Sequence, residues 1–474
     1  MLRPAGYQYN PRTIKYPEWP IIDFSGGLNN KVEDNLIKDN QCADASNVIC
    51  RTIGQMESRP GQAKLNSVDL GGAIQGLYPY YYSGNRKLIC VSNGIAYYWD
   101  PGTIAWVSFK TGLNTTSKFA FETAINYMVA MDGVGVPWKY DGTAASNLLN
   151  APALGKCPVW WREKLFCIAD SDTVQYSYEQ QPENWPAVNN KKFTPGDGDS
   201  IVLITPYGNG RELLVCKKQK IFHLTGYTID DFDQTCVEPN FGVAGLFAGI
   251  VVEPYFYYAC ENGVMQWTGL RSVNLTENSI PKTWATVNKS ALANIVISYN
   301  EPYNHLEVHV PTGASTTPNK TLIYDLNLKS WWPFDGIYPS CMTQYNDGTN
   351  IKTYIGHATL GFVIERNTGF DDYGTAITGY WQGKNFDAND QSLEKKIKKA
   401  FVHDINGGND MTYQYRVNDG TFVSPTAQTD RNGERKFRIS AKCRRFQPKL
   451  TFSSSTVKST CSGMKTIFDP GRSK

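Results

Sequence analysis

Residues 88–100 read Leu-Ile-Cys-Val-Ser-Asn-Gly-Ile-Ala-Tyr-Tyr-Trp-Asp, two strand-like runs separated by an Asn-Gly pair. An Asn-Gly pair suits a type I′ turn, because both residues tolerate positive φ and the twist of this turn matches that of the flanking strands. Residues 260–264, Cys-Glu-Asn-Gly-Val, repeat the arrangement. Both stretches predict β-hairpins closed by type I′ turns.

The hairpin pattern recurs between residues 75 and 370. In each unit a strand ends in aromatic or apolar residues and is followed by Asp, Glu or Gly, which we use as a marker. The markers are Asp100, Asp141, Glu179, Gly226, Gly269, Asp325 and Glu365. Their spacings are 41, 38, 47, 43, 56 and 40 residues. A period of about 40–45 residues, with room for four short strands, is typical of β-propeller blades.

The sequence therefore predicts an all-β protein: a β-propeller of six or seven blades with an N-terminal arm and a C-terminal β-domain. We place the arm and first strand at 1–60, the propeller at 61–375 and the C-terminal domain at 376–474. The long marker interval is attributed to an inserted loop at 311–319, and the arm is expected to hold a short helix capped by Asp39. Packed β-sandwiches would also alternate strands with Gly and Asn turns, and they remain the alternative fold.

Composition limits the class of protein. The 474 residues are 13% aromatic and 19% charged, which is too aromatic for a disordered chain. The eleven cysteines include no C-x-x-C pair, and several lie in apolar strand-like runs. They predict buried free thiols and assembly in a reducing compartment. No apolar signal core and no run of about eighteen apolar residues occurs, so we expect a soluble protein without a membrane span.

Charge is distributed unevenly along the chain. Residues 391–474 hold 17 Lys and Arg against 7 Asp and Glu, a net charge of +10, while the preceding residues hold 30 against 37, a net charge of −7. Such asymmetry is typical of contact with an acidic surface or with nucleic acid. A basic face that is merely solvated is the alternative.

The residues that could carry chemistry argue against an enzyme. His305 and His309 lie in an alternating strand-like run, which places them on one face about 13 Å apart, too far to share one zinc ion. The chain has no G-x-S-x-G nucleophile elbow and no Walker loop. We expect no catalytic residue, no metal site and no cofactor.

Paired carboxylates keep one enzymatic alternative open. Asp197 with Asp199, or Asp371 with Asp372, could serve a propeller glycosidase or carbohydrate-binding protein that acts on surface polysaccharide. Asp-Gly-Asp and Asp-Asp in turns more often bond their own backbone, however. The S-x-D-x-G-x-T-W repeat of sialidase-type propellers is also missing.

The N-terminal segment carries the order F-x-G-G-L-N, then L-x-x-x-x-Q-x-x-x-x-x-N-V, then G-x-x-x-x-R-P-G. It resembles the start of tail structural proteins of tailed bacteriophages, above all the nozzle or tail-tube proteins of short-tailed phages. The likeness covers about forty residues. The matching residues are Phe24, Gly26, Gly27, Leu28, Asn29, Leu36, Gln41, Asn47, Val48, Gly54, Arg59, Pro60 and Gly61.

The resemblance implies a virion structural protein, not an enzyme, assembled in the host cytoplasm. In that family a ring of copies, commonly six, encloses a channel through which DNA passes without specific binding, and a portal-side adaptor or other tail proteins are the partners. Nozzle, connector ring and adsorption component remain alternatives. We expect the arm to contact neighbouring subunits and the basic residues to face a subunit. The expected interface residues are Phe24, Gly26, Gly27, Leu28, Asn29, Lys395, Lys396, Lys398, Lys399, Arg444 and Arg445.

Overall fold

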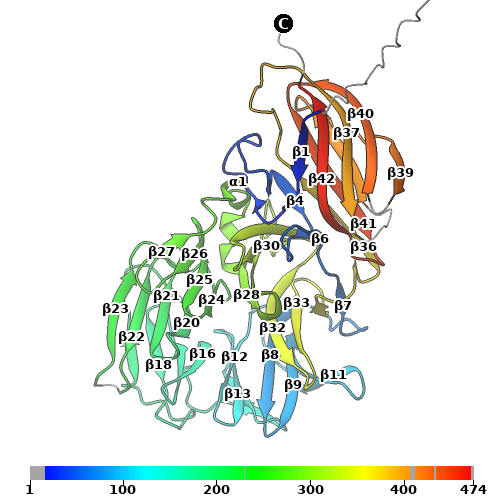
Figure 1. Ribbon diagram of the computed structural model, residues 1–474. Helices are drawn as coiled ribbons and strands as arrows, with labels where there is room; N and C mark the ends of the chain where they lie inside the picture. The colour runs from blue at the N-terminus through cyan, green and yellow to red at the C-terminus, as the bar shows by residue number, and fades with distance from the viewer. Residues whose placement is uncertain (1–15, 229, 406–410, 432–433, 471–474) are drawn as a thin grey trace, which may run out of the picture.

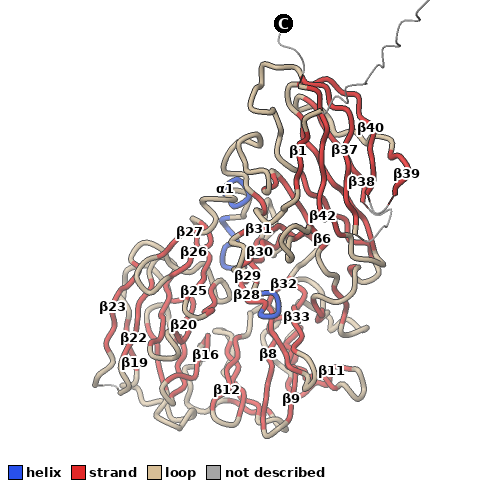
Figure 2. The backbone as a smooth tube through the Cα atoms, in the orientation of Figure 1, coloured by secondary structure: helices blue, strands red, loops and turns tan. Residues whose placement is uncertain are grey.

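The computed structural model describes residues 16–228, 230–405, 411–431 and 434–470, and its architecture is a β-propeller joined to a β-sandwich (Figures 1 and 2). Six four-stranded antiparallel sheets follow one another along the chain as blades 1–6. Short helical segments occur only in connections: α1 (Pro281–Trp284), η1 (Lys289–Asn294) and η2 (Glu301–Tyr303) among the described residues. The predicted all-β propeller is confirmed.

Each blade runs from an inner to an outer strand. Blade 1 is β8 (Ile74–Tyr82), β9 (Asn85–Ser92), β10 (Ile95–Asp100) and β11 (Ala105–Lys110), and blade 2 is β12 (Ala120–Ala124), β13 (Tyr127–Met131), β14 (Trp138–Tyr140) and β15 (Ala145–Asn147). Blade 3 is β16 (Lys156–Trp161), β17 (Lys164–Ile168), β18 (Thr173–Tyr176) and β19 (Asn190–Lys192), and blade 4 is β20 (Ile201–Tyr207), β21 (Glu212–Lys217), β22 (Ile221–Thr225) and β23 (Asp233–Glu238). Blade 5 is β24 (Gly249–Val252), β25 (Tyr255–Cys260), β26 (Gly263–Trp267) and β27 (Ser272–Asn274), and blade 6 is β28 (Val296–Asn300), β29 (His305–Val310), β30 (Lys320–Asp325) and β31 (Ser330–Asp335).

A further radial sheet closes the ring between blades 6 and 1. Its strands are β32 (Pro339–Asn346), β33 (Ile351–His357), β34 (Val363–Arg366) and the N-terminal β7 (Gln62–Lys64). β32 contacts both β28 and β8, so the inner strands form a complete circle. Figure 1 shows β8, β12, β16, β20, β24, β28 and β32 around the middle of the propeller. β7 pairs antiparallel with β34, and the first and last parts of the propeller are thereby joined by backbone hydrogen bonds.

The sandwich combines strands from both ends of the chain. Its first sheet is β39 (Ala427–Arg431), β40 (Glu434–Cys443), β37 (Lys395–Asp404) and β42 (Thr460–Asp469), with β1 (Glu18–Ile21), β6 (Met56–Ser58) and β5 (Val48–Ile49) beyond β42. Its second sheet is β38 (Met411–Val417), β41 (Phe446–Ser454), β36 (Thr375–Gln382) and β4 (Asp44–Ser46). β35 (Asp371–Asp372) connects this second sheet to β7. Residues 16–60 are thus built into the folded body.

The seven sequence markers all fall at the end of, or shortly after, the third strand of a radial sheet. Asp100 ends β10, Asp325 ends β30 and Glu365 lies in β34. The long interval before Asp325 has two sources. The predicted loop at 311–319 joins β29 to β30, and a connection at 275–295 containing α1 and η1 adds further residues.

The two Asn-Gly pairs have different roles. Asn93 and Gly94 have φ of 48° and 73°, which confirms a type I′ turn. At the second hairpin Cys260 pairs with Gly263, so the turn residues are Glu261 and Asn262 and the predicted turn type is wrong. Gly263 is instead needed for space, because a Cβ there would lie 2.3 Å from Thr276 Oγ1.

The predicted helix capped by Asp39 is also wrong. Residues 38–40 form a turn, and β3 (Gln41–Cys42) then pairs in parallel with β2 (Gly27–Leu28). Pairing with β2 provides hydrogen-bond partners for backbone N–H and C=O groups that a helix would have paired internally. All eleven cysteines are free, and Cys236 is the exposed one. No helix in the described part of the chain is long and apolar enough to cross a membrane.

A buried charged cluster lies at the seam between blade 6 and the closing sheet. Arg366 Nη2 lies 3.3 Å from Glu307 Oε2, and Asn300 Nδ2 donates to Glu307 Oε1 at 2.9 Å. His309 Nδ1 lies 2.7 Å from Thr321 Oγ1. Burial lowers the pKa of His309 to about 4 despite the neighbouring Glu307 carboxylate. Burial alone would raise the pKa of Glu307, but Arg366, His309 and Asn300 lower it.

This cluster predicts acid sensitivity of the fold. An unfolded histidine binds its proton near pH 6.5, whereas folded His309 binds it near pH 4, so the unfolded state holds more protons between these values. The free energy of unfolding should fall by about 2 kcal/mol from this residue as pH drops from 6.5 to 4. Urea unfolding of His309→Asn should show a flatter pH dependence than wild type. Substituting the exposed His403 by Gln is the control, and equal slopes for wild type and His309→Asn would contradict the prediction.

Candidate functional site

The N-terminal residues that carry the phage-tail resemblance gather at the junction between propeller and sandwich. β2 packs against β31 of blade 6, and β4 and β5 contact the same strand. β4 also pairs with β36 of the sandwich, and β7 pairs with β34 of the closing sheet. The segment from β2 to β7 therefore touches both domains along its length (Figure 1).

Arg59 is the polar centre of this junction. Its Nε donates to Asn47 Oδ1 at 2.9 Å, its Nη1 donates to Asp372 Oδ1 at 3.0 Å, and its Nη2 donates to the Asp335 carbonyl at 3.1 Å. Asn47 in turn donates from Nδ2 to the Thr378 carbonyl at 2.8 Å and accepts from Asp335 N. One buried guanidinium thus links the N-terminal segment, blade 6 and the sheet that leads into the sandwich.

Two glycines of the resemblance allow the close approach of these elements. Gly27 has φ of 63°, and a Cβ there would lie 2.7 Å from the Trp331 carbonyl. A Cβ on Gly61 would lie 2.3 Å from the Asp371 carbonyl. Side chains at either position would push the backbones of two elements apart.

The structure corrects the expected position of three predicted interface side chains, because those of Phe24, Leu28 and Lys395 are buried within the chain. Phe24 packs edge-on against Trp381, with ring centroids 5.2 Å apart. Lys395 is 2% exposed, and its Nζ donates to the carbonyls of Leu393 and Arg444 at 3.0 and 3.1 Å. Apolar side chains at β2 complete the junction core, and the sequence shows only their type, not their partner.

The other predicted interface residues divide between the junction and the sandwich surface. Gly26, Gly27 and Asn29 lie in the junction, where Asn29 Nδ2 donates to Gln41 Oε1 at 3.0 Å. Lys398 pairs with Asp469 at 3.5 Å, and Arg445 pairs with Asp419. The remaining residues, Lys396, Lys399 and Arg444, are partly or fully exposed.

The first sheet of the sandwich carries a basic outer face. Lys396 pairs in register with Lys442, and Lys399 with Arg438, while Lys436 lies beside Phe401. We call Lys396, Lys399, Lys436 and Arg438 the basic face. Among the described residues no carboxylate pairs with any of these four side chains. The sequence shows the excess of positive charge in residues 391–474, and strand pairing places four of these positive side chains on the first sheet of the sandwich.

The four carboxylates of the glycosidase alternative all form hydrogen bonds or ion pairs within the fold. Asp197 pairs with Lys217 at 2.8 Å and with Lys220 at 2.9 Å, and hydrogen bonds from these lysines hold the pKa of Asp197 far below its usual value. A carboxyl group in that state is no general acid at neutral pH. The other three accept hydrogen bonds as follows: Asp199 from Lys218 N and Gln219 N, Asp371 from Gly374 N, and Asp372 from Arg59.

The two histidines of blade 6 have separate partners. His305 Nε2 lies 3.4 Å from Asp325 Oδ2, and His309 bonds Thr321. Within the described ranges, no group of three His, Cys, Asp or Glu side chains is arranged to hold a metal ion.

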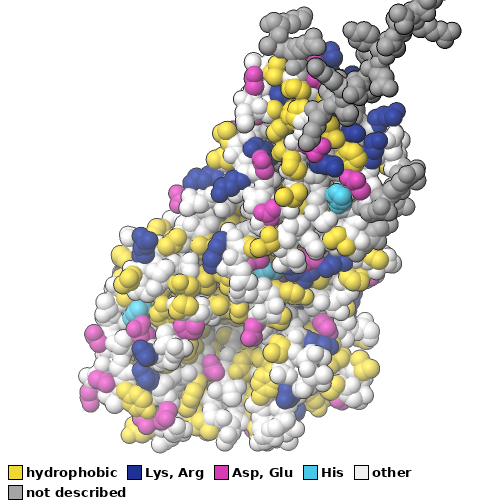
Figure 3. Space-filling model, viewed as in Figure 1, with side chains coloured by type: hydrophobic (Ala, Val, Ile, Leu, Met, Phe, Trp, Pro, Cys, Tyr) yellow, Lys and Arg dark blue, Asp and Glu magenta, His cyan; other side chains and the backbone are white. Residues whose placement is uncertain are grey.

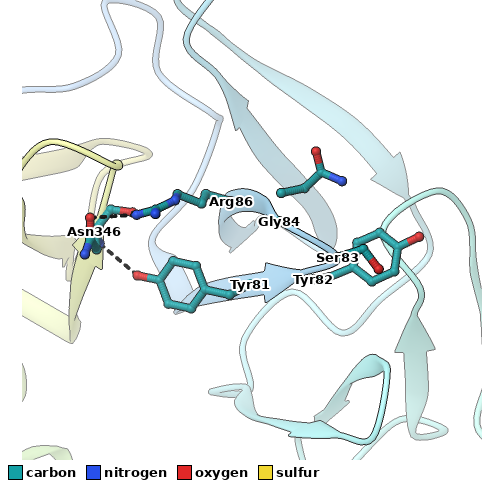
Figure 4. A pocket seen from close by; sticks show the side chains of 7 residues that line it. Tyr81, Tyr82, Ser83, Gly84, Arg86 and Asn346 are labelled. Atoms are coloured by element: carbon teal, nitrogen blue, oxygen red, sulfur yellow. Dashed lines mark hydrogen bonds between the residues drawn. The ribbon is translucent and has the colours of Figure 1, made fainter.

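A shallow pocket of about 460 Å³ lies where the β8–β9 hairpin meets the β32–β33 hairpin (Figure 4). Tyr81 is 44% exposed, and its ring is parallel to that of Tyr345 at 6.1 Å. Arg86 Nη1 donates to Asn346 Oδ1 at 2.8 Å, and Asn346 N donates to the Tyr81 hydroxyl. The amino-acid sequence gives no sign of this pocket, because its two hairpins lie about 260 residues apart in the chain.

No protein-family model matches this chain, and no curated protein matches it. A solved structure that is similar is the crystal structure of the computationally designed Ika8 protein. It shares 11% sequence identity, covers 65% of this chain and 99% of its own, and gives a TM-score of 0.43. The fold described above depends on the strand pairing of this chain itself.

The junction predicts a large cost for losing Arg59. Arg59→Leu leaves Asp372 and Asn47 without their buried donor, and the free energy of unfolding should fall by about 3 kcal/mol. Arg59→Lys should recover little, because one ammonium group cannot reach all three acceptors in the guanidinium geometry. Chemical denaturation measures the loss, with the exposed Arg271→Leu as control. A loss below about 1 kcal/mol would show that the junction is held elsewhere.

Proposed function

We propose that this chain is a structural protein of a bacteriophage tail, of the nozzle or tail-tube type found in short-tailed phages. In this proposal several copies form a ring around the path along which DNA leaves the particle. A connector ring and an adsorption component are variants of the same role. The proposal begins with the resemblance of the N-terminal segment, and three features of the structure support it.

The observation that carries the proposal is the position of the resembling residues. Phe24, Gly27, Asn47, Arg59 and Gly61 all lie at the junction, where they hold the propeller and the sandwich together. A stretch that is constrained in this way specifies a two-domain architecture, not a reaction. A tail component must keep the relative position of its domains fixed while neighbouring proteins and passing DNA exert force on it.

The second supporting feature is the narrow centre of the propeller. Side chains of the inner strands line an open central cavity of about 480 Å³. Duplex DNA, whose major groove alone is about 12 Å wide, cannot pass through a space of this size. In this proposal the DNA path therefore runs between copies of the chain that are arranged in a ring.

The third supporting feature is the basic face. A DNA conduit should not hold phosphates, because each neutralised phosphate adds affinity that ejection must overcome. We therefore place the basic face against an acidic surface of an adjacent copy or of another tail protein, away from the DNA path. Lys395 has no part in this contact, because it is buried.

The proposed location is tested on virus particles. An antibody against this chain should label the tail of particles made by the phage whose genome encodes it, and electron microscopy of the purified chain or of the tail should show a closed ring with a central opening. The same antibody against particles that lack a tail is the control. Absence of the chain from purified particles would overturn the proposal.

The basic face predicts assembly that depends on salt. Replacing its four residues by Gln should weaken ring or tail assembly several-fold at 0.05 M salt, and the difference from wild type should shrink at 1 M salt, where the Debye length is about 3 Å. Sedimentation or particle incorporation measures this. The control variant removes the same number of charges outside the sandwich. It replaces four exposed lysines by Gln: Lys38, Lys218, Lys289 and Lys329. Equal assembly of both variants at every salt concentration would contradict the role of the basic face.

A carbohydrate-binding role is the second candidate, and one observation favours it. The pocket of Figure 4 presents the exposed Tyr81 ring beside Arg86, Asn85 and Ser83, a combination that suits stacking and hydrogen bonding to a sugar. This pocket, and not the four aspartates of the sequence analysis, would be the site. An adsorption component could carry both roles.

A further inference from the structure

The central cavity of the propeller is lined by residues of all seven inner strands, β8, β12, β16, β20, β24, β28 and β32 or the residues just before them. Figure 3 shows the surface hollowed at the centre of the ring of blades. The lining is mainly apolar and includes the rings of Tyr78, Phe119, Phe121 and Phe247. The volume of about 480 Å³ is that of a small-molecule site.

Glu122 is the charged residue that lines this cavity. Its Oε1 accepts from the backbone N–H of Thr123 at 2.9 Å, and the carboxylate also accepts a backbone hydrogen bond from Trp160. No lysine, arginine or histidine pairs with its carboxylate among the described residues. Burial raises the pKa of Glu122 to about 7. The neighbouring polar groups are occupied, because the Tyr78 hydroxyl and Thr123 Oγ1 bond each other at 2.9 Å.

Lys118 lies four residues earlier in the chain, next to two residues of the cavity lining. Its Nζ lies 5.6 Å from the centre of the Phe247 ring, and Cys341 is beside it; both residues line the cavity. No carboxylate pairs with Nζ in the part of the chain that the structure describes. Burial lowers the pKa of Lys118 to about 8. An extended chain places the two α-carbons about 13 Å apart, so the charges do not neutralise each other directly.

We propose that the central cavity binds a short apolar zwitterion, a peptide of two or three residues with free termini, whose ammonium group pairs with Glu122 and whose carboxylate pairs with Lys118. A tripeptide spans about 10 Å, which is of the same order as the distance of about 13 Å that an extended chain places between the α-carbons of the two residues. Its apolar side chains contact the aromatic lining. The inference stands apart from the proposed ring, because every contact lies inside one copy.

An uncharged ligand or a simple cation fits the cavity less well. An apolar molecule would cover two charges without giving them partners, which is costly because the ligand removes water from both. A diamine would satisfy Glu122 but place a second positive charge near Lys118. Opposite charges at the two ends of one apolar body satisfy both residues.

Calorimetric titration of the full chain at pH 7.5 with Leu-Phe-Leu tests the proposal. The free peptide should bind saturably. N-acetylation should weaken binding to the wild type roughly tenfold but leave binding to Glu122→Gln unchanged. C-terminal amidation should weaken binding to the wild type roughly tenfold but leave binding to Lys118→Met unchanged. Glu277→Gln, an exposed carboxylate, is the control and should behave as wild type.

Each other result overturns the assignment. No saturable binding of the free peptide to the wild type would remove the site. Equal affinity for free and capped peptides would show a site for apolar molecules without end-group recognition. Binding of the free peptide that Glu122→Gln leaves unaffected would exclude the carboxylate. The thermal unfolding midpoint of each variant shows whether that variant is folded. If a variant is not folded, the affinities of the wild type for the free and the capped peptides test the proposal without it.

Discussion

The two-domain architecture depends on the buried Arg59 guanidinium. It is bonded at once to Asn47, to Asp372 and to the Asp335 carbonyl, so three segments that are far apart in sequence share one polar centre. A buried guanidinium is stable only when its donors are paired, and removal of any partner leaves a charge or a donor in a dry environment. The position of the sandwich relative to the propeller therefore follows from a geometry that tolerates little variation.

Closure of the propeller uses the same segment. Two residues after Pro60 the chain enters β7, which supplies the outer strand of the closing sheet. Pairing of the N-terminal strand with C-terminal strands joins the ring by main-chain hydrogen bonds, which do not depend on side-chain identity. Next to this seam, Glu307 and Arg366 form a second buried ion pair. The junction and the seam together explain why residues 16–60 form part of the body and not a free arm.

The surfaces left over by this architecture differ in character. The sandwich presents the basic face on one sheet, and the rim of the propeller presents the Tyr81 pocket. Glu122 lines the central cavity and Lys118 lies next to its lining, and neither has an ionic partner among the described residues. A protein that acts by holding neighbours in place needs the first of these surfaces. The other two are concave and polar enough to take small ligands, and they use residues that the junction does not need.

The amino-acid sequence by itself determined the repeat. Aromatic strand ends followed by Asp, Glu or Gly recur because every blade packs apolar side chains against its neighbouring blades and then turns, and this local requirement is visible in a run such as residues 97–100. Local chemistry also predicted the type I′ turn at Asn93-Gly94. Where the turn depended on packing, as at Gly263 beside Thr276, the local rule failed. The helix at Asp39 failed for the same reason, because pairing between β2 and β3 decided that segment.

Only the tertiary structure decided which charges are structural and which are available. Lys395 and Lys396 are neighbours of the same type, yet strand alternation buries the first under backbone carbonyls and exposes the second on the basic face. The partners of Arg59, the two hairpins of the Tyr81 pocket and the inner strands around Glu122 come together from separations of tens to hundreds of residues. Sequence patterns report periodicity and local propensity, whereas burial and pairing of charges depend on long-range contacts that have no local signal.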